Sequence, residues 1–275
     1  MSADSTRYYL RFRLYHRILH IMVIVSFLGL ALTGMSLKFS DVEWGRLLSW
    51  LLGGPFSCRI LHRFFAVVTF LYFGLHLVWI VRSMLKNGFK RTFWGPESMM
   101  PQPKDILQLY QNVKHFLGLG PAPKFDRYTY WEKFDYLAVF WGVVIIGFTG
   151  LVLWFPLLFA KLLPGIWINA AIIVHSDEAL LAVGFIFTIH FFNTHLRPEK
   201  FPMDKVIFTG RVTEEELKNE RPEEYKRLAE TGGLEKIETG EPRHWVYTVA
   251  KVGGFAAVII GVIMIVLIIW SIVFR

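Results

Sequence analysis

Five long apolar stretches limit what this chain can fold into more than any other feature of its sequence. Their approximate bounds are residues 17–39, 60–82, 134–155, 167–192 and 248–274. At about 1.5 Å per residue, each stretch is long enough to cross the roughly 30 Å hydrocarbon core of a bilayer as an α-helix. The chain is 54% hydrophobic and 19% charged, which is less charge than a soluble domain of this length carries. The sequence therefore predicts an all-α integral membrane protein with five spanning helices.

Lysine and arginine residues are distributed unevenly between the segments that connect these helices. Residues 1–17, 83–132 and 194–247 carry 21 of them, whereas the other exposed segments carry 4. Positively charged segments tend to stay on the cytoplasmic side of a membrane. We therefore expect a protein of a bacterial-type inner (cytoplasmic) membrane, with its N-terminus inside and its C-terminus outside. The same asymmetry accounts for the net charge of +8, so no nucleic-acid partner is expected.

The composition divides the chain into three parts. Residues 1–195 form a four-helix core, whose cytoplasmic segment 83–133 contains the periodic run "DILQLYQNVKHFLGLG". That run is typical of an amphipathic helix lying at the membrane surface. Residues 196–247 form a charged cytoplasmic cap, and residues 248–275 hold a fifth, C-terminal transmembrane helix for packing or anchoring.

The cap carries local signals for short helices. Thr213 and Glu216 have the spacing of a capping box, in which each side chain bonds the other residue's backbone N–H. Pro222 suits the first turn of a second helix, and Gly232 with Gly233 ends it. We interpret the charges of this cap as ordinary solvated surface.

Histidines occur where a membrane helix has few reasons to carry them. Six of the nine lie in or at the ends of predicted helices, namely His20, His62, His76, His175, His190 and His195. An ionisable residue inside a membrane span is costly, so it indicates a functional site.

The spacing of four histidines places them in two same-face pairs. His62 and His76 are 14 residues apart on the second helix, which is about 40° short of four full turns and roughly 21 Å along the axis. His175 and His190 are 15 residues apart on the fourth helix, about 60° past four turns and roughly 22 Å apart. Each helix therefore carries one histidine near each membrane surface.

Two layers of inward-facing imidazoles suit two b-type haems stacked in a helix bundle. Neutral imidazole is a good axial ligand for haem iron, and a haem fills the core of a bundle. His62 and His175 are the predicted ligands of the outer haem. At the inner level His190 can pair with His20 or His76; spacing alone favours His76, and a third haem would use the surplus histidine.

Two other classes of function also use buried polar groups. A proton- or ion-translocating transporter would use the histidines as relays, although it predicts broken helices and inverted repeats. A non-redox membrane anchor would leave the same-face histidines unexplained. The single cysteine, Cys58, rules out an iron–sulfur cluster held by this chain alone, and no C-x-x-C-H run is present for covalently attached haem. Any further redox centre must therefore belong to partner subunits on the outer side.

Four motifs resemble the b-type cytochrome subunit of membrane-bound formate dehydrogenases. They are "RILHIMVIVSFLGLALTGMSL", "RILHRFFAVV", "GFTGLVLWFP" and "IVHSDEAL". The same superfamily includes the cytochrome b subunits of nickel–iron hydrogenases and of thiosulfate reductases, and the resemblance covers about residues 10–195. It implies that His62 pairs with His175 at the outer haem and His20 with His190 at the inner one. It also implies electron transfer between an outer-side partner and menaquinone or ubiquinone.

The sequence departs from this family in three respects. His76 stands where the family core has no histidine, and the fourth-helix pair is 15 residues apart instead of 14, so we expect a local bulge. The cap and the fifth helix are additional. The run "NTHLRPEKFPMD" is similar to a subgroup associated with multihaem cytochromes. The expected outer-side partner is therefore an iron–sulfur, molybdoenzyme, hydrogenase or multihaem cytochrome c subunit.

The resemblance also implies a quinone pocket near the start of the third helix. Tyr128, Glu132 and Lys133 occupy matching positions in "YTYWEKFDY", whereas Thr129 replaces the family's usual asparagine. Carboxylates there suit a substrate that exchanges protons as well as electrons, although anchoring at the membrane interface would also explain these residues.

Charged residues also flank the predicted outer ligands. Arg59 and Arg63 flank His62 and suit either haem propionates or lipid headgroups. Glu178 is about 60° from His175 around the helix and Asp177 about 200°. We therefore expect Glu178 near the outer haem and Asp177 facing a partner or the headgroups. Together these features predict a quinone-reactive di-haem cytochrome b, the electron-transfer subunit of a respiratory oxidoreductase.

Overall fold

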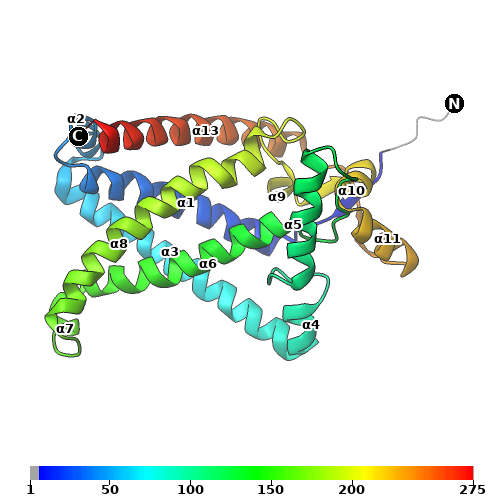
Figure 1. Ribbon diagram of the computed structural model, residues 1–275, viewed down its shortest axis with the longest axis horizontal. Helices are drawn as coiled ribbons and strands as arrows, with labels where there is room; N and C mark the ends of the chain where they lie inside the picture. Colours follow the sequence, from blue (N-terminus) through cyan, green and yellow to red (C-terminus); the bar gives the residue numbers. More distant parts are fainter. Residues whose placement is uncertain (1–5, 275) are drawn as a thin grey trace. The chain divides into compact units, whose positions relative to one another are not determined.

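The computed structural model describes residues 6–274 and is predominantly helical (Figure 1). Within these described residues, five helical segments are long and apolar enough to cross a membrane, which confirms the predicted number of spans. They are α1 (Leu14–Lys38), α3 (Gly54–Asn87), α6 (Tyr130–Trp154), the segment Gly165–Leu196 and α13 (His244–Val273). The chain forms two compact units, a membrane unit of residues 18–76, 139–204 and 249–275 and a polar unit of residues 1–17, 77–138 and 205–248.

Large apolar side chains from three helices form the core of the membrane unit. Its buried members are Ala31, Met35 and Phe39 of α1, Val183, Phe187 and Phe191 of the segment Gly165–Leu196, and Met264 and Ile268 of α13. The fifth helix is therefore packed into this unit, as a packing helix should be. Few residues of α3 and α6 are buried inside this unit.

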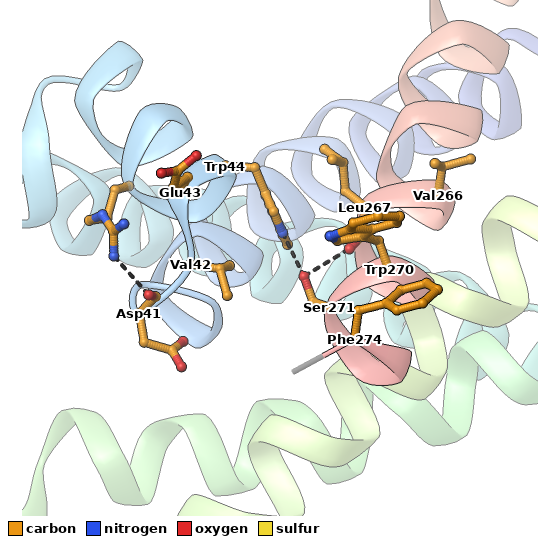
Figure 2. A pocket seen from close by; sticks show the side chains of 10 residues that line it. Asp41, Val42, Glu43, Trp44, Val266, Leu267, Trp270, Ser271 and Phe274 are labelled. Atoms are coloured by element: carbon orange, nitrogen blue, oxygen red, sulfur yellow. Dashed lines mark hydrogen bonds between the residues drawn. The ribbon is translucent and has the colours of Figure 1, made fainter.

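A short helix, α2 (Glu43–Leu51), lies in the connection between α1 and α3 and was not predicted. It packs against the end of α13, where the Trp44 indole N–H donates a hydrogen bond of 2.7 Å to Ser271 Oγ. Figure 2 shows this bond beside a cavity of about 580 Å³ lined by aromatic and charged side chains. A second short helix, α7 (Pro156–Phe159), follows α6.

The fourth spanning segment changes its helical winding before its end. It begins as α8 (Gly165–Phe185) and continues as two π-helical turns, η1 (Ile186–His190) and η2 (Phe192–Leu196). A π turn accommodates one extra residue in a helix. The bulge expected from the 15-residue spacing of His175 and His190 is therefore present, and it brings the two histidines closer to one face.

The polar unit contains a small antiparallel sheet that the all-α prediction missed. Its strands are β1 (Tyr8–Leu10), β2 (Arg211–Thr213) and β3 (Glu238–Thr239), in the order β2-β1-β3. Tyr9 of β1 opposes Val212 of β2 and Glu238 of β3. Strands of two or three residues leave no readable alternation in a sequence, which is why this sheet went unpredicted.

Short helices complete the polar unit. They are α4 (Phe89–Trp94), α5 (Pro103–Phe116), α9 (Val206–Thr209), α10 (Glu214–Glu220), α11 (Pro222–Glu230) and α12 (Leu234–Ile237). The capping box is confirmed, because Thr213 Oγ1 accepts from the Glu216 N–H and Glu216 accepts from the Thr213 N–H. Pro222 opens α11, and Gly232 follows it with a φ of 62°, in the left-handed region that glycine favours.

The sequence predicted that the charges of the cap would be ordinary solvated surface, and this prediction is wrong for Glu224. Glu224 of α11 is only 1% exposed. Its carboxylate accepts hydrogen bonds from Arg11 at 2.6 Å and from Arg127 at 2.8 Å. Burial alone would raise the pKa of this carboxyl, but the two guanidinium groups hold the pKa below its ordinary value. The partners lie 213 and 97 residues away in sequence, so local patterns did not reveal the pairing.

Candidate functional site

Two histidines from different helices face each other inside the membrane unit. The ring centres of His62 on α3 and His175 on α8 are 6.2 Å apart, with an angle of 76° between the ring planes. A bond between a metal ion and an imidazole nitrogen is roughly 2 Å long, so two imidazoles binding one ion from opposite sides have ring centres roughly 6 Å apart. The observed separation therefore fits one iron atom between the two rings.

Each of these imidazoles is held at one nitrogen by a neighbouring helix. His62 Nδ1 is 2.9 Å from Thr33 Oγ1 of α1. His175 Nδ1 is 3.0 Å from the carbonyl oxygen of Ile146 and 3.3 Å from Thr149 Oγ1, both on α6. A hydrogen bond at Nδ1 fixes the ring and directs Nε2 towards a metal. Within residues 6–274, Nδ1 of each ring is therefore occupied and Nε2 is the nitrogen left for a metal.

Glycines follow both threonines and give the imidazoles room. A Cβ atom on Gly34 would lie 3.2 Å from His62 Cε1, and one on Gly150 would lie 3.0 Å from His175 Cε1. Both distances are shorter than comfortable packing allows, so a side chain at either position would press on a ligand ring. The dipeptides Thr33-Gly34 on α1 and Thr149-Gly150 on α6 are therefore equivalent. In each, the threonine bonds a histidine Nδ1 and the glycine leaves space for the ring.

The inner histidines belong to the same unit. The resemblance implies a pair of His20 with His190, whereas spacing alone favours His76 as the partner of His190. All three candidates, His20, His76 and His190, are half-buried.

A haem suits this donor set better than a free metal ion does. Within residues 6–274, no three His, Cys, Asp or Glu side chains gather to hold a metal ion. A haem iron brings four nitrogens of its own and needs only two axial ligands from the protein. The pair His62 and His175 supplies that number with the required separation, so the residues present fit haem b.

Three of the four remaining histidines have contacts that explain their positions without a ligand. Buried His195 has its Nδ1 3.0 Å from the carbonyl oxygen of Pro202. The ring of His16 meets the edge of Trp79 at 5.0 Å between centres. His115 is exposed on α5, with its Nδ1 3.2 Å from the carbonyl oxygen of Gly120.

The charged residues near the outer pair differ in their surroundings. Arg59 and Arg63 are exposed, and the Arg63 guanidinium lies 5.4 Å from the ring centre of Trp154. Asp177 is exposed and accepts a hydrogen bond of 3.1 Å from Lys38. Glu178, one residue further along α8, is half-buried. The two neighbouring acids therefore face different environments.

The predicted quinone residues lie in the polar unit, at the start of α6. Thr129 is fully buried and forms a capping box with Glu132, whose carboxylate also accepts two bonds of 3.0 Å from Arg221. The adjacent Lys133 is 2% exposed and donates to both Asp105 oxygens, at 2.9 and 3.0 Å. Tyr128 lies beside the guanidinium groups of two arginines.

Sequence reasoning missed Thr33, Thr149 and Asp105. The two threonines lie in "ALTGM" and "GFTGL", and the repeated Thr-Gly dipeptide on two predicted spans was the available signal. Asp105 lies on the predicted amphipathic helix, 28 residues before Lys133, and no local pattern links them.

Fold and site together define a class, a multi-pass helical membrane protein in which two histidines, His62 and His175, are separated by a distance that fits one haem iron. Comparison with known proteins agrees with this class. The chain is 22% identical, over 238 residues, to the cytochrome b556(Fdn) subunit of nitrate-inducible formate dehydrogenase from Escherichia coli K12, and equally to those of Escherichia coli O157:H7 and Shigella flexneri. The match covers 86% of this chain and 99% of each relative. No family model matches the sequence.

Proposed function

We propose that this chain is the quinone-reactive di-haem cytochrome b subunit of a respiratory oxidoreductase. It carries electrons between outer-side redox partner subunits and the quinone pool of a bacterial-type inner membrane. The observation that carries the proposal is the pair His62 and His175, whose ring centres are 6.2 Å apart and whose Nδ1 atoms are both held by neighbouring helices. The similarity of the chain to the cytochrome b556 subunit of a formate dehydrogenase further supports the proposal.

In this proposal the chain's residues act in three places. His62 and His175 hold the outer haem, and His20 and His190 hold the inner one, with His76 the alternative partner or a ligand of a third haem. Bound haem supplies one-electron transfer. Arg59 and Arg63 bind propionates, and Glu178 sets the charge beside the outer haem.

Tyr128, Glu132 and Lys133 border the proposed quinone site at the cytoplasmic end of α6. Menaquinone and ubiquinone are both suitable substrates, since each accepts or releases two electrons with two protons. The partner on the outer side is an iron–sulfur, molybdoenzyme, hydrogenase or multihaem cytochrome c subunit, because Cys58 alone holds no cluster.

Haem stoichiometry tests this proposal directly. We expect two b haems per purified chain, and one after His62→Ala or His175→Ala, in pyridine haemochrome spectra. Exposed His115→Ala is the matched control and should keep both haems. A menaquinol or ubiquinol analogue should reduce the haems of the wild type. A chain that binds no haem would refute the proposal, and a third haem lost in His76→Ala would add His76 to the ligands.

A further inference from the structure

Helix α5 presents three different faces around its circumference. At about 100° per residue, Asp105, Gln108 and Asn112 share an arc of about 60°, and they are 6%, 7% and 8% exposed. The next arc, about 20–140° from Asp105, is apolar and exposed, and we call it the apolar arc. It consists of Ile106, Leu109, Tyr110, Val113, Phe116 and Leu117. The third arc, about 180–280° from Asp105, holds Lys104, Leu107, Gln111, Lys114 and His115.

Two polar contacts fix the rotation of α5 within the polar unit. Asp105 accepts hydrogen bonds of 2.9 and 3.0 Å from the ammonium group of Lys133, which is 2% exposed. The Asn112 amide donates to the Tyr130 hydroxyl at 2.9 Å. Rolling the helix to cover its apolar arc would break both contacts and leave a buried ammonium group unpaired, which is strongly unfavourable. The apolar arc therefore faces away from this unit.

The residues that hold α5 belong to the beginning of a spanning helix. Tyr130 is the first residue of α6, and Lys133 lies in its first turn. The polar unit also contains ends of three other spanning helices, residues 14–17 of α1, 77–87 of α3 and 244–248 of α13. Spanning helices enter or leave the bilayer at such ends. Helix α5 thus lies at the level of a membrane surface, where an exposed apolar face meets acyl chains.

The exposed charges of α5 are positive. Its only acidic residue, Asp105, is buried against Lys133, whereas Lys104 and Lys114 are half-exposed. Lys114 lies at the border of the apolar arc, about 40° beyond Tyr110, and its ammonium group is 5.6 Å from the centre of the Tyr110 ring. Lysine and tyrosine side chains of this kind hold their polar ends at the headgroups of a membrane. Lys104 lies about 180° from the middle of the apolar arc, so it points away from the lipid.

We propose that α5 binds anionic phospholipids at the membrane surface, with its apolar arc among the acyl chains and Lys114 at a headgroup phosphate. The sequence predicted a helix at the surface, and the structure adds which side of it faces lipid and which lysine meets the headgroups. The positive charge at the border of the apolar arc suits an anionic lipid. Neither haem nor quinone takes part in this contact, so its test is independent of the proposed function.

Spin labels on introduced cysteines test the orientation of α5 in the full chain, reconstituted in bilayers of phosphatidylcholine and phosphatidylglycerol. Ile106→Cys and Val113→Cys place a label on the apolar arc, and Gln111→Cys places one on the third arc as the matched control. Cys58 is fully buried, so labelled wild type gives the background, and Cys58→Ala removes any signal from it. Oxygen dissolves among acyl chains, whereas a nickel chelate stays in water, and each accelerates the relaxation of a label that it reaches.

We expect oxygen to reach the labels at positions 106 and 113 more readily than the nickel chelate does, with the reverse order at position 111. Access of the nickel chelate to all three labels would place the apolar arc in water. Exclusion of both reagents from positions 106 and 113 would show that protein, such as a second copy of this chain, covers the arc. Either result would overturn the proposal.

The choice of lipid tests the headgroup contact. A fluorophore on Val113→Cys is quenched by phosphatidylglycerol or by phosphatidylcholine that carries the same nitroxide. We expect the anionic lipid to quench more strongly, by up to roughly fivefold, the enrichment that one lysine gives at an anionic surface. Adding Lys114→Gln should remove this difference, whereas Lys104→Gln on the far side should keep it. Equal quenching by the two lipids, or equal effects of the two lysine substitutions, would refute the role of Lys114.

Discussion

The polar unit and the membrane unit differ in how completely their polar side chains are hydrogen-bonded. In the polar unit, both carboxylate oxygens of Glu224 are bonded, one by Arg11 and the other by Arg127. In the membrane unit, His62 is held by Thr33 at Nδ1, while Nε2 makes no hydrogen bond within residues 6–274. The fully bonded network around Glu224 stabilises the fold. A ring that is fixed at one nitrogen and open at the other is prepared for a ligand.

Breaking the closed network should have the largest effect on stability. Glu224→Gln leaves Arg11 and Arg127 without the buried negative charge that pairs with them. Removing one partner from a buried ion pair costs about 3–5 kcal/mol, so we expect a loss of about that size in the polar unit. Proteolytic sensitivity of residues 205–248 on heating should rise sharply. The haem content should not change.

The control for this substitution is Glu230→Gln on the same helix. Glu230 is exposed and lies 3.8 Å from Lys226, and exposed ion pairs contribute little. If the two variants unfold alike, Glu224 does not hold the polar unit together.

The pH dependence of stability should follow the same carboxylate. Because its pKa is lowered in the folded state, its contribution is complete above the ordinary glutamate value of 4.5. The contribution is lost as the pH falls below that value and through the pKa of the folded state. The stability difference between wild type and Glu224→Gln should therefore shrink on acidification. A difference that stays constant down to the acid limit would contradict this assignment.

The membrane unit should respond through haem binding. A Cβ atom at Gly150 would lie 3.0 Å from His175 Cε1, and the branches of Gly150→Val enlarge that conflict. Overpacking of this kind costs about 1–3 kcal/mol, which we expect to appear as reduced occupancy of the outer haem. Gly142→Val on the same helix is the control, since its nearest neighbour is 3.9 Å away. Equal haem content in the two variants would show that haem binding does not depend on the space that Gly150 leaves beside the His175 ring.

The hydrogen bonds that the two threonines make to Nδ1 should affect the midpoint potential of the outer haem. Thr149→Val removes a hydroxyl that lies 3.3 Å from His175 Nδ1, and Thr33→Val removes one at 2.9 Å from His62 Nδ1. Weaker hydrogen bonding at Nδ1 makes the imidazole a poorer electron donor to iron, so the outer haem should become easier to reduce. A net hydrogen bond of about 1 kcal/mol corresponds to about 40 mV for one electron. Thr33→Val should shift the potential more, because Ile146 also holds His175, and the serine variants should keep the wild-type value.

The same contrast explains what the sequence could reveal. Hydropathy predicted five spanning helices, and the Thr213 capping box was readable because its partners are three residues apart. The histidine spacing placed His62 and His175 at one level, and the 15-residue interval, compared with the 14 residues of the resembled family, predicted the π turn that ends at His190. These signals are local or periodic, so they survive in a linear sequence.

Contacts between distant segments left little such signal beyond the repeated Thr-Gly dipeptide. Glu224 and Arg11 are 213 residues apart, and nothing near either one indicates burial. Thr149 also bonds the carbonyl oxygen of Ile145, four residues earlier in its own helix. That is an ordinary arrangement for threonine in an apolar helix, so its place beside His175 emerges only when α6 and α8 pack.

The smallest expected effect distinguishes two neighbouring acids on α8. Glu178 is half-buried, whereas Asp177 is exposed and bonded to Lys38 at 3.1 Å. A buried charge near the outer haem acts through a lower dielectric than an exposed one, which water and salt screen. Glu178→Gln should therefore raise the outer haem's midpoint potential by a few tens of millivolts at most, roughly the scale of 0.5 kcal/mol. Asp177→Asn should leave that potential unchanged in a redox titration at moderate salt. If the two variants give the same potential, Glu178 does not act on the haem, and the half-buried face of α8 carries a charge that serves packing alone.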